Sequence, residues 1–254
     1  MDSRNSIRAP WWGRTACTVA ACCALVVGWE VPGAEAGQGA AAAAPADGTP
    51  APEAAPAAAV PVQRLDGGSV CVGGITVDPR SRSVSFAATM NLAQGVLEVI
   101  IATPEGRLHE ALLKSEVSPL RLQALLYTLN LNNGPRQRDS TGRMGDLVDI
   151  DIEYSGADGK TVRAPVESWI RDTRTGAPLK RIGWVFTGSA MRDGVFLAEE
   201  EGNICINYSV GSTILDSPDP QSLDDTIHVV ETLRTEPALG SPVKVIITAR
   251  SKAP

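Results

Sequence analysis

Short apolar runs separated by turn residues are the main pattern along this chain. The densest run beyond the N-terminus is Val96–Ile101, which is broken only by the polar residue Glu98. Its shortness and its β-branched side chains are typical of a buried strand. Thr103–Gly106 has proline in second place and glycine in fourth, which favours a type I turn. Arg107–Leu113 then predicts a second strand, although Leu108, Ala111 and Leu112 would also share one face of a helix.

Two further segments alternate between apolar and polar residues, as half-buried strands do. The first is Ser83–Met90, in which small hydroxyl side chains separate the apolar ones. The second is Leu147–Tyr154, and its polar positions form an acidic row: Asp149, Asp151 and Glu153. A turn at 155–159 and a returning strand at Lys160–Val166 complete a predicted hairpin.

One segment has the period of a helix instead. Ser118 can cap this helix, and Pro119 fits its first position, where no backbone N–H is needed. Four leucines then recur with the spacing of a single apolar stripe: Leu122, Leu125, Leu126 and Leu129. Asn132–Pro135 ends the helix, because its glycine accepts a positive φ and its proline cannot continue the turn.

The remaining apolar runs also predict short strands: Ser69–Val77, Trp184–Phe186, Val195–Ala198, Asn203–Val210, Thr226–Val230 and Val243–Ala249. We expect the third and fourth of these to pair across the charged turn Glu199–Gly202. The helix must bury its leucine stripe on the nearest apolar surface. The sequence therefore predicts an α+β fold: a mainly antiparallel β-sheet of short strands, with one main amphipathic helix packed on a face.

Residues 1–36 have the pattern of a secretory signal peptide. Three arginines precede the apolar run Thr15–Val27, which is too short to span a bilayer comfortably. Ala34–Ala36 then fits a cleavage site, so a periplasmic or secreted bacterial protein would begin at Gly37. A retained membrane anchor and a lipid anchor at Cys22 are the alternatives to simple cleavage.

The composition changes again after the signal. Residues 37–63 are mostly alanine and proline, with too few bulky apolar side chains to offset the entropy of ordering. We expect a disordered tether there, followed by a single folded domain over 64–254. The net charge of −6 survives cleavage, and no basic stripe is present, which disfavours nucleic-acid partners. No second apolar stretch is long enough for a membrane span after signal cleavage.

Five cysteines become two after cleavage, Cys71 and Cys205. In an oxidising compartment these two could form a disulfide. Their apolar, strand-like surroundings suit two buried free thiols as well. Because spacing alone does not establish the geometry that a disulfide needs, both alternatives stay open.

His109 and Glu110 are the first candidates for chemistry. A histidine beside a carboxylate can transfer protons or bind a metal. Neighbours on a strand point to opposite faces, however, and the second histidine of a zinc-protease motif is absent. The structural alternative is a hydrogen-bonded histidine without a catalytic role. We expect the other histidine, His228, to face outward from its strand.

The other candidate sites also have structural alternatives. The acidic row of the hairpin could bind a divalent cation, but a solvated face that pairs with Lys160 and Arg163 is favoured. Ser189 follows an apolar strand without the G-x-S-x-G elbow of a nucleophile, so a turn or cap is favoured there. Trp169 and Trp184 could form a carbohydrate or peptide platform, although a core role is favoured for both.

Several short motifs resemble the YdjY-type domain. They are GRLHEALL at Gly106–Leu113, the helix at Pro119–Leu129, WVFTGS at Trp184–Ser189, TEP at Thr235–Pro237 and GSPV at Gly240–Val243. The resemblance covers about Gly68–Arg250 and implies an exported bacterial domain, of a family largely without assigned function. Some relatives are described as ferredoxin-like. Two cysteines cannot supply the four thiolates of an ordinary cluster, so we expect no cofactor.

The sequence therefore predicts an exported, non-catalytic binding or envelope-associated domain. Its partner would be an envelope or extracellular protein, or a small ligand. The alternative is a hydrolase or metal-dependent enzyme that uses His109 with nearby carboxylates. A cleft that holds His109 and a second histidine or carboxylate within hydrogen-bond reach would favour this enzyme.

Overall fold

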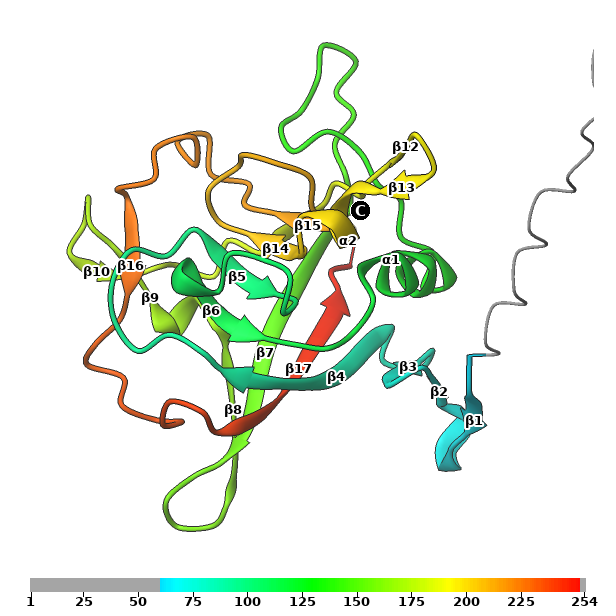
Figure 1. Cartoon of the computed structure of the whole chain (residues 1–254), viewed down its shortest axis with the longest axis horizontal. Helices are drawn as coiled ribbons and strands as arrows, with labels where there is room; N and C mark the ends of the chain where they lie inside the picture. The colour runs from blue at the N-terminus through cyan, green and yellow to red at the C-terminus, as the bar shows by residue number, and fades with distance from the viewer. Residues whose placement is uncertain (1–59, 252–254) are drawn as a thin grey trace, which may run out of the picture. The chain divides into compact units, whose positions relative to one another are not determined.

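Eight strands form a closed, mixed barrel at the centre of the fold (Figure 1). A computed structural model describes residues 60–251, so the predicted signal peptide and most of the predicted tether lie outside the described residues. In hydrogen-bonded order, the barrel strands are β4 (Ser83–Met90), β17 (Pro242–Ala249), β7 (Leu147–Ser155), β11 (Trp184–Phe186), β15 (Leu215–Asp216), β14 (Asn203–Ile206), β5 (Val99–Ala102) and β6 (Ala111–Lys114).

Pairing between β6 and β4 closes the barrel, with Leu113 opposite Met90 and Lys114 opposite Thr89. Two neighbouring pairs are parallel, β14 with β15 and β5 with β6, and the other barrel pairs are antiparallel. The prediction of an α+β fold, with a helix on one face of a sheet, is therefore wrong. The physical reason is that the apolar period of a strand indicates which of its side chains are buried. It does not indicate which distant strand it pairs with, and barrel closure depends on that pairing.

The other elements extend or accompany the barrel. The sheet continues outward from β4 through β3 (Ile75–Asp78), β2 (Val70–Val72) and β1 (Val62–Arg64), while β8 (Thr161–Pro165) pairs with β7. A second sheet contains β10 (Ala177–Pro178), β9 (Ile170–Asp172) and β16 (His228–Val230), and β12 (Met191–Arg192) pairs with β13 (Val195–Phe196). The helices are α1 (Pro119–Thr128) and α2 (Leu197–Glu200), with 3₁₀ turns at Asp66–Gly68, Leu108–Glu110 and Val166–Trp169. Because β1 starts at Val62, regular structure begins inside the segment predicted as tether.

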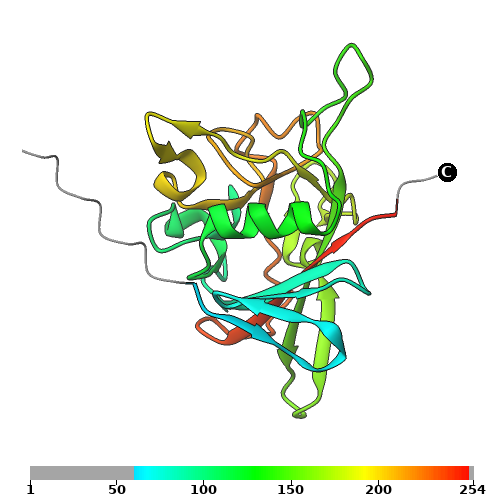
Figure 2. The ribbon, with the colours of Figure 1, turned by 90° about the vertical axis from the view of Figure 1, so that its right-hand side faces the viewer.

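The predicted helix is present as α1. The backbone N–H of Arg121 donates to Ser118 Oγ over 3.2 Å, so the predicted N-cap is confirmed. Leu122 and Leu126 are fully buried in the main core. Figure 2 shows α1 lying between the β3–β4 ribbon and the α2 segment. The leucine stripe therefore packs onto the barrel rather than facing solvent.

Two other sequence predictions have opposite outcomes. The β7–β8 hairpin is confirmed, with Val148, Ile150, Ile152 and Tyr154 of β7 buried. The pairing of Val195–Ala198 with Asn203–Val210 is wrong, because β13 pairs with β12 and β14 pairs with β5 and β15. The residues Leu197–Glu200, all four of which are good helix formers, form α2 between β13 and β14.

Both tryptophans considered for a binding platform are core residues, as the sequence favoured. Trp184 is fully buried and Trp169 is 1% exposed. Neither can therefore present its ring to a large ligand on the surface. Among residues 60–251, neither α1 nor α2 is long and apolar enough to cross a membrane.

Candidate functional site

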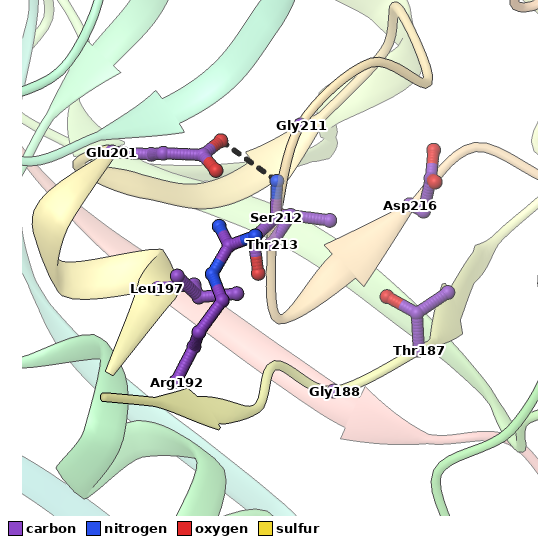
Figure 3. A pocket seen from close by; sticks show the side chains of 9 residues that line it. All are labelled: Thr187, Gly188, Arg192, Leu197, Glu201, Gly211, Ser212, Thr213 and Asp216. Atoms are coloured by element: carbon purple, nitrogen blue, oxygen red, sulfur yellow. Dashed lines mark hydrogen bonds between the residues drawn. The ribbon is translucent and has the colours of Figure 1, made fainter. Parts of the chain in front are cut away.

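A pocket of about 380 Å³ lies beside β11 and β15, where several polar side chains meet (Figure 3). Its walls combine charged side chains, hydroxyl side chains, glycines and one leucine: Arg192, Glu201, Asp216, Thr187, Ser212, Thr213, Gly188, Gly211 and Leu197. All of them lie between residues 187 and 216. Thr187 directly follows β11, and Asp216 ends the neighbouring strand β15, so strand pairing places their backbones close together.

Asp216 is the buried carboxyl of this pocket, with 7% of its surface exposed. Burial raises the pKa of Asp216 to about 6, because the ionised form loses hydration. The hydroxyl of Ser209, which donates to Oδ1 over 2.6 Å, opposes this rise, and so does Arg136, whose Nε lies 4.0 Å from Oδ2. Asp216 can therefore act as a hydrogen-bond donor below about pH 6 and as an acceptor above it.

Glu201 also lines the pocket, and its carboxylate is hydrogen-bonded to neighbouring protein groups. Its Oε2 accepts from the backbone N–H of Ser212 over 2.7 Å and from Asn203 Nδ2 over 3.1 Å. Figure 3 shows the bond to Ser212. Gly211 has a φ of +99°, and a Cβ there would collide with Glu201 Oε2. The positive φ favours glycine at this position, and the hydrogen bond from Ser212 to Glu201 holds the Gly211–Thr213 segment beside the glutamate.

Arg192 supplies the cation. It comes from β12, and in Figure 3 its guanidinium lies beside the Ser212–Thr213 segment, on the other side of the pocket from Asp216. Within residues 60–251 its side chain has neither a hydrogen bond nor an ion pair, although the pocket also contains two carboxyl groups. Its hydrogen-bonding capacity is therefore available to an anionic group of a ligand.

The structure places Ser189 next to this pocket, in a supporting position. Its Oγ lies 2.6 Å from Ser212 Oγ and accepts from the backbone N–H of Ala198 over 3.0 Å. Gln123 fixes its backbone through both amide atoms, at 2.7 Å and 3.1 Å. Within residues 60–251, no histidine is among the partners of Ser189. Its hydrogen bonds fit the turn or cap that the sequence favoured.

His109 lies elsewhere, at the surface. The segment predicted as a strand begins with a 3₁₀ turn over Leu108–Glu110, and 75% of the His109 side chain is exposed. The turn brings His109 Nε2 within 3.6 Å of Glu110 Oε1. Arg107 forms ion pairs with both Glu110 and the buried Glu98. Glu110 thus belongs to a surface ion-pair group, and neither residue lines the polar pocket.

His228 does not face outward, so that prediction is wrong. It is 2% exposed, and burial lowers the pKa of its imidazole because the charged form would lose hydration. The apolar neighbours Ile227 and Val229 do not fix which side chains of β16 face inward, and in the structure β16 pairs with β9, with His228 opposite Asp172.

The acidic row on β7 is paired with arginines and a lysine. Asp149 contacts Arg250 at 2.6 Å and Arg181 at 3.2 Å, and Asp151 contacts Arg163 at 2.7 Å and Arg181 at 3.0 Å. Burial opposes ionisation of Asp149, but these arginines hold the pKa of its carboxyl below the usual value. In the same row, Glu153 lies 3.4 Å from Lys244.

The carboxylates of the acidic row thus form ion pairs with arginine and lysine side chains of the same chain. Arg163 is a partner as expected, whereas Lys160 instead pairs with Asp158 in the turn. The part of the chain that the structure describes contains no group of three or more histidine, cysteine or acidic residues arranged to hold a metal ion.

Cys71 and Cys205 are free thiols on β2 and β14. Cys205 is fully buried, and burial, with Asp216 and Glu167 nearby, raises the pKa of its thiol well above the usual value. We therefore expect iodoacetamide to label Cys71 roughly 100-fold faster than Cys205 in the folded chain. Peptide mapping by mass spectrometry measures both rates. A Cys71–Cys205 disulfide peptide in a non-reducing digest would contradict this expectation.

The comparisons with known proteins give no assignment. No family model, curated protein or solved structure matches this chain. The resemblance to the YdjY-type domain therefore stays a prediction that rests on the short motifs. Function has to be argued from the chemistry of the site itself.

Proposed function

We propose that this chain is an exported binding domain whose polar pocket holds a small zwitterion, such as a free α-amino acid. The observation that carries the proposal is that Arg192, a cation without a partner among residues 60–251, and the buried carboxyl of Asp216 line the same pocket. The ligand carboxylate would bind the guanidinium fork of Arg192. Its ammonium group would bind Asp216, which is mostly ionised above about pH 6.

The size and lining of the pocket support this ligand class. A volume of about 380 Å³ is near the lower end of the range for small-molecule sites. Thr187 and Ser212 add hydroxyl groups that can donate to or accept from a polar ligand. Export rests on the pattern of residues 1–36 and on the resemblance to an exported family.

We propose a binding function for this chain rather than catalysis through His109. His109 is exposed and lies outside the pocket, and its nearest carboxylate, at 3.6 Å, is its own neighbour Glu110. The pocket serine, Ser212, shares its hydroxyl hydrogen bond with Ser189 rather than with a base. A nucleophile needs such a base for activation.

Substitution of Arg192 by glutamine tests the proposal. We expect a saturable rise in melting temperature with at least one α-amino acid at pH 7, and a Kd roughly 30-fold weaker in Arg192→Gln. The reason is the loss of a charge-assisted hydrogen bond, which contributes about 2 kcal/mol. Thermal-shift screening followed by isothermal titration calorimetry measures both effects.

Two controls decide whether charge recognition is responsible. Amino-acid amides lack the carboxylate and should bind the wild type as weakly as amino acids bind the variant. Arg80→Gln removes an exposed arginine outside the pocket and should bind like the wild type. The proposal fails if no amino acid shifts the melting temperature, or if both arginine variants bind equally well.

A further inference from the structure

A second pocket, of about 300 Å³, lies between the end of β4 and the segment that follows β16. Most of its walls are apolar, and they include Met90, Leu92 and Leu239. Arg234 is its charged lining residue, and none of the residues that line it is acidic. Leu239 is 63% exposed at the rim, so apolar surface continues from the pocket to solvent. An apolar pocket with one cation is complementary to an anion that carries an apolar tail.

Packing holds the guanidinium of Arg234 in place. Its central carbon lies 3.7 Å from the ring centroid of Trp169, and Nη2 donates to the hydroxyl of Tyr154 over 3.4 Å. Trp169 is itself fixed, because its Nε1 donates to the backbone carbonyl of Glu236 over 3.2 Å. Arg234 therefore presents a cation that is ordered before any ligand arrives, which lowers the entropic cost of binding.

The hydrogen-bonding capacity of Arg234 is largely unused. Its Nε is buried and has no acceptor, and among the described residues Nη1 has none either. Buried polar groups in folded proteins nearly always have partners, so the buried, unpaired Nε of Arg234 calls for an acceptor, and Nη1 adds a donor that a ligand can use. A carboxylate supplies two oxygen acceptors and one negative charge.

We propose that this pocket binds a monocarboxylate with an apolar tail, of the size class of octanoate. The carboxylate contacts Arg234, and the tail lies against Met90, Leu92 and Leu239. None of these residues lines the polar pocket that contains Arg192, so this site is separate from the proposed function. The fold thus offers one polar pocket for a zwitterion and one apolar pocket for an amphipathic anion.

The test uses the full chain and octanoate, with octanol and octylammonium as probes that keep the tail but change the head group. We expect octanoate alone to raise the melting temperature saturably. Arg234→Gln should weaken octanoate binding at least 10-fold in calorimetry. Arg192→Gln should leave octanoate binding unchanged, which separates this site from the polar pocket.

Two exposed leucines provide a matched pair of variants in case Arg234→Gln does not fold. Leu239→Glu places a negative charge at the rim and should weaken octanoate binding at least 10-fold. Leu233→Glu places the same charge on a leucine that is 81% exposed and does not line the pocket, so its binding should equal that of the wild type. The proposal is overturned if octanoate gives no saturable shift, if octanol shifts the melting temperature equally, or if Leu239→Glu binds octanoate like the wild type.

Discussion

Replacing Leu126 with alanine is expected to lower the free energy of unfolding by about 3 kcal/mol. Leu126 is fully buried in the main core, where the stripe of α1 packs on the barrel. The substitution removes apolar area from the core and leaves a cavity that a close-packed interior fills only in part. Urea unfolding, followed by circular dichroism, measures the change.

Leu120 offers the matched control on the same helix. It is 45% exposed, so Leu120→Ala removes the same atoms where they bury little surface. We expect a change within about 0.5 kcal/mol for this variant. Equal losses for the two variants would mean that α1 does not pack on the barrel through its leucine stripe.

The features that the sequence predicts correctly depend on local interactions, whereas closure of the barrel depends on residues far apart in the chain. The cap at Ser118, the leucine stripe and the β7–β8 hairpin depend on residues close together in the chain, and all three could be predicted. Closure depends on β6 reaching β4, and on the parallel pairing of β5 with β6. Nothing in the period of either strand specifies its partner, so an open sheet was the simplest expectation.

The polar pocket could not be predicted from the sequence, because it too depends on how distant segments pack. Asp216 opens the polar stretch 216–225, and nothing in that composition indicates that its carboxyl is buried. Arg192 lies in a short segment without a motif, and nothing in that segment indicates that its guanidinium has no partner within residues 60–251. His109 was the more obvious candidate, because histidine beside glutamate is a familiar pattern. The burial of Asp216 and the absence of a described partner for Arg192, rather than residue type, distinguish these two positions from His109.

Replacing Asp216 with asparagine is expected to stabilise the folded chain, and the gain should grow as the pH rises. Burial raises the pKa of Asp216 from an ordinary 3.8 to about 6. Well below pH 4 the carboxyl of Asp216 is protonated in both the folded and the unfolded chain, so it does not lower the free energy of unfolding. Between pH 4 and 6 the unfolded chain releases the proton and the folded chain retains it, so wild-type stability falls as the pH rises. Above pH 6 the full loss, about 3 kcal/mol, is present.

The Asp216→Asn variant has no such loss, because asparagine does not ionise and its oxygen can still accept from Ser209. We expect the difference in free energy of unfolding, variant minus wild type, to increase by up to ~3 kcal/mol between pH 4 and pH 7. Urea unfolding at half-unit pH steps measures this difference and cancels the titration of all other groups.

Asp224→Asn gives a control with the opposite sign. The exposed carboxylate of Asp224 accepts from Thr226, which holds its pKa below the usual value, so folding favours the ionised form. Its stabilising effect is complete above the unfolded pKa of about 3.8 and is lost as the pH falls through the lower folded pKa. This variant should therefore lose stability relative to the wild type only as the pH rises towards about 4, and its difference should stay nearly flat between pH 4 and pH 7. If the Asp216→Asn difference were flat between pH 4 and pH 7, Asp216 would titrate like an exposed carboxyl. Its carboxyl would then be hydrated, and the pocket would lack the buried acid on which the proposed binding of an ammonium group depends.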